Sequence, residues 1–117
     1  MKPKILIVDD EVSILQSLSG VLEDEGYRVS VAASGEESLE DVRKDSPDLV
    51  LLDIWMPGMD GLAVLKEIKS SYPQLPVIII SGHANIETAV KATRMGAFDF
   101  VEKPLSLERI LVSIQNG

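Results

Sequence analysis

The fold is decided by residues 48–61, Asp48-Leu49-Val50-Leu51-Leu52-Asp53-Ile54-Trp55-Met56-Pro57-Gly58-Met59-Asp60-Gly61. The run of apolar residues before Asp53 predicts a short strand buried on both faces, because it is too short for a helix. The proline and glycines that follow Asp53 are typical of a loop. Ligands bind at the carboxyl ends of strands in an open α/β sheet, so Asp53 is predicted to lie at a functional edge.

Short apolar runs and amphipathic helical segments alternate along the whole chain. Strands are expected at residues 4–8, 28–31, 48–52, 77–80 and 98–101, and helices at 11–25, from 34, at 60–71, at 85–95 and from 106. This order predicts a parallel sheet with helices on both faces. The second and fifth runs alternate polar with apolar residues, which favours sheet edges. The expected fold is therefore a flavodoxin-like (βα)5 domain with strand order 2-1-3-4-5.

The composition limits the class of protein. The chain has 117 residues, 45% of them hydrophobic, no cysteine and a formal net charge of −8. This predicts a single globular domain without disulfides or thiolate metal sites. The negative charge argues against nucleic-acid binding by this segment. The chain has neither a membrane-length apolar run nor a signal-peptide pattern, so a cytoplasmic location without membrane contact is expected.

The predicted strand order brings three carboxylates together, those of Asp9, Asp10 and Asp53. Two such charges about 4 Å apart repel by roughly 4 kcal/mol at an effective dielectric constant near 20. Lys103 offers one compensating charge, and a hard cation such as Mg²⁺ resolves the rest. The cation would also draw a phosphoryl donor to the same place. Asp53 is then the predicted phosphoryl acceptor, with Lys103 and the Ser81 hydroxyl as partners for the phosphate.

These residues carry a family resemblance over the whole chain, in the order Asp9, Asp10, Asp53, Met56-Pro57, Asp60-Gly61, Ser81 and Lys103. The chain resembles the receiver domain of bacterial response regulators in two-component signalling, typified by the chemotaxis response regulator. The resemblance implies phosphoryl transfer to Asp53 from the phosphohistidine of a sensor histidine kinase. It implies Mg²⁺ bound directly by Asp10, mainly through water by Asp9, and by the backbone carbonyl of Trp55. Lys103 would pair with Asp53 and then with its phosphate, and Ser81 would move toward the phosphate.

Three positions modulate this expectation. Phe100 stands where the family often has a tyrosine that rotates on activation, and a phenyl ring has no hydroxyl to donate. A switch at Phe100 must therefore work by packing alone. Trp55 and His83 flank the expected phosphate, and the bulk of Trp55 is predicted to hinder the attacking water. His83 is otherwise read as an exposed loop residue, and Phe98 and Phe100 as core aromatic residues.

The predicted output surface consists of the helix from Asn85, the strand at Phe98 and the helix from Ser106. The helix at Asn85 offers a thin apolar face, mainly Ile86, Ala89 and Val90, which suits an element that shifts between two arrangements. Ser81-Gly82-His83 and residues 96–104 look like the enhancer-binding, nitrogen-regulation-type transcription regulators. This implies homodimerisation through the output surface. It also implies that residues 1–117 form the N-terminal receiver of a longer regulator, with a stand-alone receiver left open.

Three other readings compete with the phosphorylation switch. A Mg²⁺-dependent phosphatase with an aspartyl-phosphate intermediate would need a second acid two residues after Asp53, where this chain has Trp55. Flavodoxin itself would need a phosphate-binding loop where the chain has acidic residues 9–11. A degenerate receiver that acts through protein contacts alone does not explain the intact acidic trio and Lys103. Asp48 and Asp60 are read as turn or cap residues.

Overall fold

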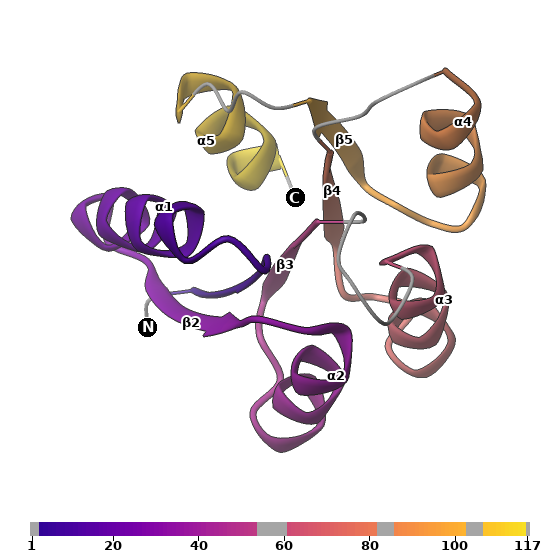
Figure 1. Cartoon of the computed structure of the whole chain (residues 1–117), viewed down its shortest axis with the longest axis horizontal. Coiled ribbons are helices and arrows are strands. Elements are labelled where there is room, and N and C mark those ends of the chain that lie inside the picture. Colours follow the sequence, from indigo (N-terminus) through magenta and orange to yellow (C-terminus); the bar gives the residue numbers. More distant parts are fainter. Residues whose placement is uncertain (1–2, 54–60, 82–85, 103–106, 117) are drawn as a thin grey trace.

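A computed structural model describes residues 3–53, 61–81, 86–102 and 107–116. Strands and helices alternate strictly along these residues (Figure 1). The strands are β1 (Lys4–Val8), β2 (Arg28–Ala32), β3 (Leu49–Asp53), β4 (Val77–Ser81) and β5 (Asp99–Glu102). The helices are α1 (Val12–Asp24), α2 (Gly35–Lys44), α3 (Gly61–Ser71), α4 (Ile86–Arg94) and α5 (Leu107–Asn116).

All strand pairs are parallel, and the sheet has the order β2-β1-β3-β4-β5. Val8 pairs with Leu52 across β1 and β3, and Ile79 pairs with Phe100 across β4 and β5. Helices α1 and α5 cover one face, and α2, α3 and α4 cover the other (Figure 1). The predicted flavodoxin-like fold and strand order are confirmed.

Two apolar clusters, one on each face, explain why the central strands carry runs of four consecutive apolar residues. Leu6 and Val8 of β1 pack in the cluster that also holds Val64 of α3. Ile5 and Ile7 point the other way and pack with residues of α1 and α5. Successive side chains of a strand point to opposite faces, so a strand with helices on both sides must be apolar throughout.

Capping hydrogen bonds and glycines define the helix ends. The backbone N–H of Glu37 donates to the Ser34 hydroxyl oxygen at 3.1 Å, so Ser34 caps α2 at the predicted helix start. The Glu37 carboxylate accepts from the backbone N–H of Ala33 at 3.3 Å, one residue earlier than in a standard capping box. Gly26 and Gly96, after α1 and α4, have φ angles of 94° and 101°, as expected for glycine after a helix end. Asp60, predicted as a turn or cap residue, and the predicted helix starts at Asn85 and Ser106 lie outside the described residues.

The structure corrects several core assignments. Phe98 is 46% exposed and so is not a core aromatic, because it precedes edge strand β5, which has a neighbouring strand on only one side. Phe100 is half-buried and packs against the cluster beneath α2, α3 and α4. Val90, predicted on the apolar face of its helix, is 43% exposed, and among the side chains of residues 87–94 Ala92 is the fully buried one. Within the described residues, no helix has the length and apolar character required to cross a bilayer.

Candidate functional site

The sheet register brings Asp9 and Asp53 together at the carboxyl ends of two neighbouring strands. Val8 pairs with Leu52, so the residues that follow them, Asp9 and Asp53, lie next to each other. Carboxylate oxygens of Asp9, Asp10 and Asp53 all lie within 4.8 Å of one another. Asp9 is 0% and Asp53 is 2% exposed, whereas Asp10 faces solvent. The convergence of these three residues, predicted from the strand order, is thus present in the structure.

Backbone contacts fix the position of Asp9. Its N–H donates to the carbonyl of Ala32 at 3.1 Å, which extends the pairing of β1 with β2 by one residue. Its Oδ1 accepts a hydrogen bond from the N–H of Glu11 at 2.9 Å, in the turn that leads into α1. Oδ1 of Asp9 thus has a local structural role in this turn. This anchoring also orients the carboxylate toward Asp53 and Asp10.

The electrostatics of the three carboxylates suit a hard divalent cation. At 4.8 Å two unit negative charges repel by more than about 3 kcal/mol at an effective dielectric constant of 20. Burial of two of the three groups removes the water that would otherwise solvate them. Mg²⁺ is typically held by one or two carboxylates and keeps several waters, and the exposed side at Asp10 leaves room for water. The residues present therefore fit a magnesium site.

Ser81 lies beside Asp53 at the same edge of the sheet. Asp53 pairs with Ile80 across β3 and β4, and Ser81 is the next residue and the last of β4. Ser81 is fully buried and pairs in turn with Glu102, the last residue of β5. Phe100 is two residues earlier on β5, in the apolar layer beneath α4. Lys103, Trp55 and His83 lie outside the described residues, so their predicted roles stay predictions.

A polar cluster that was not predicted ties β5 to α5. Arg109 donates two hydrogen bonds to the carboxylate of Asp99, at 2.8 and 3.0 Å, and the Ser113 hydroxyl donates a third at 2.6 Å. The Arg109 hydrogen bonds are the main reason why the pKa of Asp99 is lowered to about 2, against the opposing effect of burial. The available signal was the i, i+4 spacing of Arg109 and Ser113 on a predicted helix. It does not reveal which strand residue they meet.

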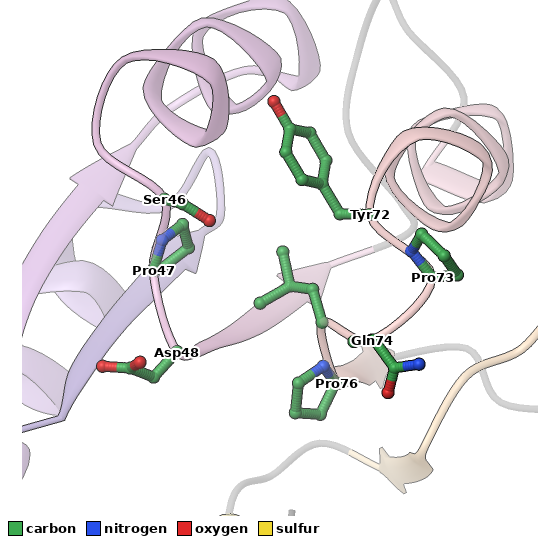
Figure 2. A pocket seen from close by; sticks show the side chains of 8 residues that line it. Ser46, Pro47, Asp48, Tyr72, Pro73, Gln74 and Pro76 are labelled. Atoms are coloured by element: carbon green, nitrogen blue, oxygen red, sulfur yellow. The ribbon is translucent and has the colours of Figure 1, made fainter.

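A pocket of about 350 Å³ lies away from the carboxylates (Figure 2). Ser46, Pro47 and Asp48 form one side of it, and Tyr72 and Pro73 form the other. Asp48 precedes β3, so the pocket lies at the amino ends of the strands, whereas Asp53 and Ser81 are at the carboxyl ends. The Asp48 carboxylate accepts from the backbone N–H of Lys4 at 2.7 Å and holds two strand starts together. This pocket is therefore distinct from the candidate metal site.

Comparison with known proteins identifies the family of the chain. The family model of the response regulator receiver domain matches residues 5–115, and the chain belongs to this family. Receiver domains of this kind act as phosphorylation-dependent switches in two-component signalling and are not classical enzymes.

Similar proteins include regulators of transcription. The chain is 47% identical over 114 residues to the nitrogen assimilation regulatory protein NtrX of Azorhizobium caulinodans, covering 96% of this chain and 25% of that protein. It is 43% identical over 113 residues to the transcriptional regulatory protein ZraR of Escherichia coli, covering 97% and 26% respectively. The chain thus spans about a quarter of the length of these curated relatives.

Solved structures of receiver domains superpose closely on the chain. The receiver domain of NtrX from Brucella abortus has a TM-score of 0.90 and 48% identity, covering 96% of this chain and 95% of that chain. A CheY-like receiver domain protein from Methanospirillum hungatei has a TM-score of 0.95 and 34% identity, covering 99% and 93%. The fold described above is therefore the CheY-like receiver fold.

Proposed function

We propose that Asp53 accepts a phosphoryl group from the phosphohistidine of a sensor histidine kinase. The observation that carries this proposal is the convergence of the Asp9, Asp10 and Asp53 carboxylates at the carboxyl edge of the sheet. An Asp53 carboxylate oxygen forms the new bond to phosphorus while the phosphorus–nitrogen bond of the phosphohistidine breaks. The electron pair of that bond stays on the imidazole nitrogen. The product is a mixed anhydride, which stores the signal until water hydrolyses it.

Residues around Asp53 prepare it for this reaction. Asp9, Asp10, Asp53 and the backbone carbonyl of Trp55 are proposed to hold Mg²⁺. When bound, the cation neutralises the carboxylates and the charge on the phosphoryl group. Lys103 is proposed to pair with the Asp53 carboxylate and later with a phosphate oxygen. The Ser81 hydroxyl, at the adjacent strand end, donates a hydrogen bond to another phosphate oxygen.

Phosphorylation is proposed to act on α4 because β4 leads from Ser81 toward that helix. A phosphoryl group adds about −1.5 to −2 charges, and it draws the Ser81 hydroxyl toward Asp53. Among the side chains of residues 87–94 in α4, Ala92 is the only fully buried apolar one, so little burial in this part resists a shift of the helix. Phe100 packs under this region and has no hydroxyl, so it follows the shift through packing alone.

The output surface on α4, β5 and α5 is proposed to form a homodimer on activation. Val90 of α4 is 43% exposed, Phe98 just before β5 is 46%, and Val112 of α5 is 52%. A twofold interface would cover the same apolar side chains on both copies. Residues 1–117 are proposed to be the N-terminal receiver of a longer cytoplasmic transcription regulator, in which this domain does not contact nucleic acid. A stand-alone receiver would use the same surface for a different protein.

Phosphoryl transfer and sedimentation together test this function. The chain is incubated with an autophosphorylated sensor kinase and Mg²⁺, and the label on Asp53 and on an Asp53→Asn variant is compared. Sedimentation with beryllofluoride, a phosphate mimic, then compares wild type, Val112→Glu and Val31→Glu, the last a control exposed to a similar degree on edge strand β2. The proposal expects label on Asp53 alone and dimers that only Val112→Glu prevents. Label on the Asp53→Asn variant, or dimers of Val112→Glu, would contradict it.

A further inference from the structure

The groove between α3 and α4 has a charge opposite to that of the domain. The chain carries 19 acidic and 11 basic residues, yet among the described residues the groove is lined by Lys66, Lys69 and Lys91 and by no acidic side chain. Its volume is about 660 Å³, and α3 and α4 lie on the same face of the sheet (Figure 1). A cationic groove on an acidic domain selects for an anionic partner, because most of the remaining surface repels one.

The three lysines do not play the same part. The Lys69 ammonium donates hydrogen bonds to the backbone carbonyls of Pro73 and Leu75, both at 2.9 Å. Its aliphatic stem lies against Gly96 in the turn between α4 and β5. Lys69 therefore has a structural role at the side of the groove, and its ammonium is already hydrogen-bonded. Lys66 and Lys91 are exposed and form no ion pair with any residue in the described ranges, so their charges remain available for a partner.

The rest of the lining is apolar. Leu62 and Met95 are half-buried and Ala63 is exposed, so the groove offers an apolar strip between its two available ammonium groups. The lining on α3 runs from Leu62 to Ser70, about 12 Å along the axis at 1.5 Å per residue. Apolar grooves of this length that contain methionine are suited to amphipathic helices. A small anion would leave the apolar strip uncovered.

We propose that the groove between α3 and α4 docks an acidic amphipathic helix of a protein partner. The apolar stripe of that helix covers Leu62, Ala63 and Met95, and its carboxylates pair with Lys66 and Lys91. The link to signalling rests on the proposed function, because α3 and α4 are the helices that follow the strands ending at Asp53 and Ser81. Phosphorylation that moves α4 relative to α3 changes the groove and hence the affinity for the helix.

Titration with a synthetic helix tests the groove. The probe is a fluorescent peptide of about 14 residues, roughly four turns, with Leu at i, i+3, i+4 and i+7 and Glu elsewhere. Two further peptides serve as controls: one with the same composition in scrambled order, and one with Lys in place of Glu. The variant is Lys66→Glu/Lys91→Glu, and Lys44→Glu on α2 is the matched charge control outside the groove. Circular dichroism checks that each variant is folded.

The proposal expects tighter binding of the patterned acidic peptide than of either control peptide. The double variant is expected to lose about tenfold or more in affinity, and Lys44→Glu less than about twofold. Amide chemical-shift changes should fall on α3 and α4. Equal binding of the scrambled peptide, shifts confined to other helices, or an unchanged affinity of the double variant would overturn the proposal. Self-association of the protein that Lys66→Glu/Lys91→Glu abolishes, without peptide binding, would overturn it in favour of a second copy.

A titration with beryllofluoride distinguishes peptide binding at the groove from the proposed phosphorylation switch at Asp53. With Mg²⁺ present, the same titration is repeated while amide shifts at Asp9, Asp53 and Ser81 report occupancy of the phosphoryl site. A changed peptide affinity together with shifts at these residues supports the coupling. An unchanged peptide affinity despite those shifts overturns the coupling between the phosphoryl site and the groove, but not peptide binding itself. Unchanged amide shifts at Asp9 and Asp53 count against the proposed function. The titration without beryllofluoride still tests whether the groove binds the peptide.

Discussion

The carboxylates of Asp9 and Asp53 lie within 4.8 Å of each other although both are almost completely buried. Their backbones are fixed by β1 and β3, which pair directly at Val8 and Leu52. The backbones of the two residues therefore cannot separate without disturbing the centre of the sheet. The fold maintains a repulsive arrangement at its edge, and such arrangements are typical of functional sites.

Removing one of the two charges is expected to stabilise the metal-free protein. Asp9→Asn keeps an oxygen for the N–H of Glu11 and removes the repulsion, so the free energy of unfolding should rise by about 1–3 kcal/mol. Urea unfolding in the presence of a chelator measures this change. Mg²⁺ should then stabilise wild type more than the variant. Asp48→Asn, an exposed change just before β3 that keeps an oxygen for the backbone N–H of Lys4, is the control and should shift stability by less than about 0.5 kcal/mol. A less stable Asp9→Asn protein would count against the repulsion.

Stability at low pH is expected to depend on Asp99. The hydrogen bonds from Arg109 hold the pKa of Asp99 at about 2, below its ordinary value of 3.8. Because the folded pKa is the lower one, the stabilisation is complete above pH 4 and is lost as the pH falls toward 2. Asp99→Asn should therefore cost about 1–2 kcal/mol at pH 7 and much less at pH 2.5. Urea unfolding across this range measures both values.

A variant in a surface ion pair provides the control for Asp99→Asn. Glu40 accepts from Arg43 at 2.9 Å, and both side chains are at least half exposed, so Glu40→Gln should change stability by less than about 1 kcal/mol. If Asp99→Asn and Glu40→Gln change the free energy of unfolding equally at every pH, the hydrogen bonds from Arg109 to Asp99 do not stabilise the β5–α5 contact.

Two glycines with similar backbone angles are expected to differ in their tolerance of alanine. Gly26 has a φ of +94° and nothing within 4 Å of an added Cβ, so Gly26→Ala should cost about 1–2 kcal/mol from backbone strain alone. Gly96 has a φ of +101°, and an added Cβ would lie 3.1 Å from the Cε of Lys69. Thermal unfolding should therefore show a larger loss for Gly96→Ala, and Lys69→Met, which frees the stem from its hydrogen bonds, should reduce the difference. Equal losses would remove the Lys69 contact as a constraint.

The lifetime of the phosphoryl group is expected to depend on Trp55. The sequence places this bulky residue two positions after Asp53, where it would hinder the attacking water. Trp55→Ala should then speed the decay of the phosphorylated protein several-fold, and Trp55→Phe, which keeps an aromatic ring, should do so less. Decay is followed by intact mass after the phosphoryl donor is removed. Identical decay of all three proteins would exclude the shielding role.

The sequence predicts the sheet and the carboxylate cluster because both depend on strand order. A strand such as β1, with four consecutive apolar residues at 5–8, has to lie between helices on both faces, and this places Asp9 beside Asp53. Other features depend on how a helix is rotated and how far it lies from its neighbour. The exposure of Val90, the contact of Arg109 with Asp99 and the cationic groove at Lys66 and Lys91 are of this kind. Periodicity identifies a helix without fixing its rotation on the sheet.

The central claim is that Asp53 becomes a phosphoryl acceptor because a cation occupies the neighbouring carboxylates. Intact mass measured after incubation with acetyl phosphate tests it most directly, with and without Mg²⁺, for wild type, Asp53→Asn and the control Asp48→Asn. The predicted result is the addition of one phosphoryl group to wild type and to Asp48→Asn, only with Mg²⁺, and none to Asp53→Asn. Addition without a divalent cation, or to Asp53→Asn, would contradict the account.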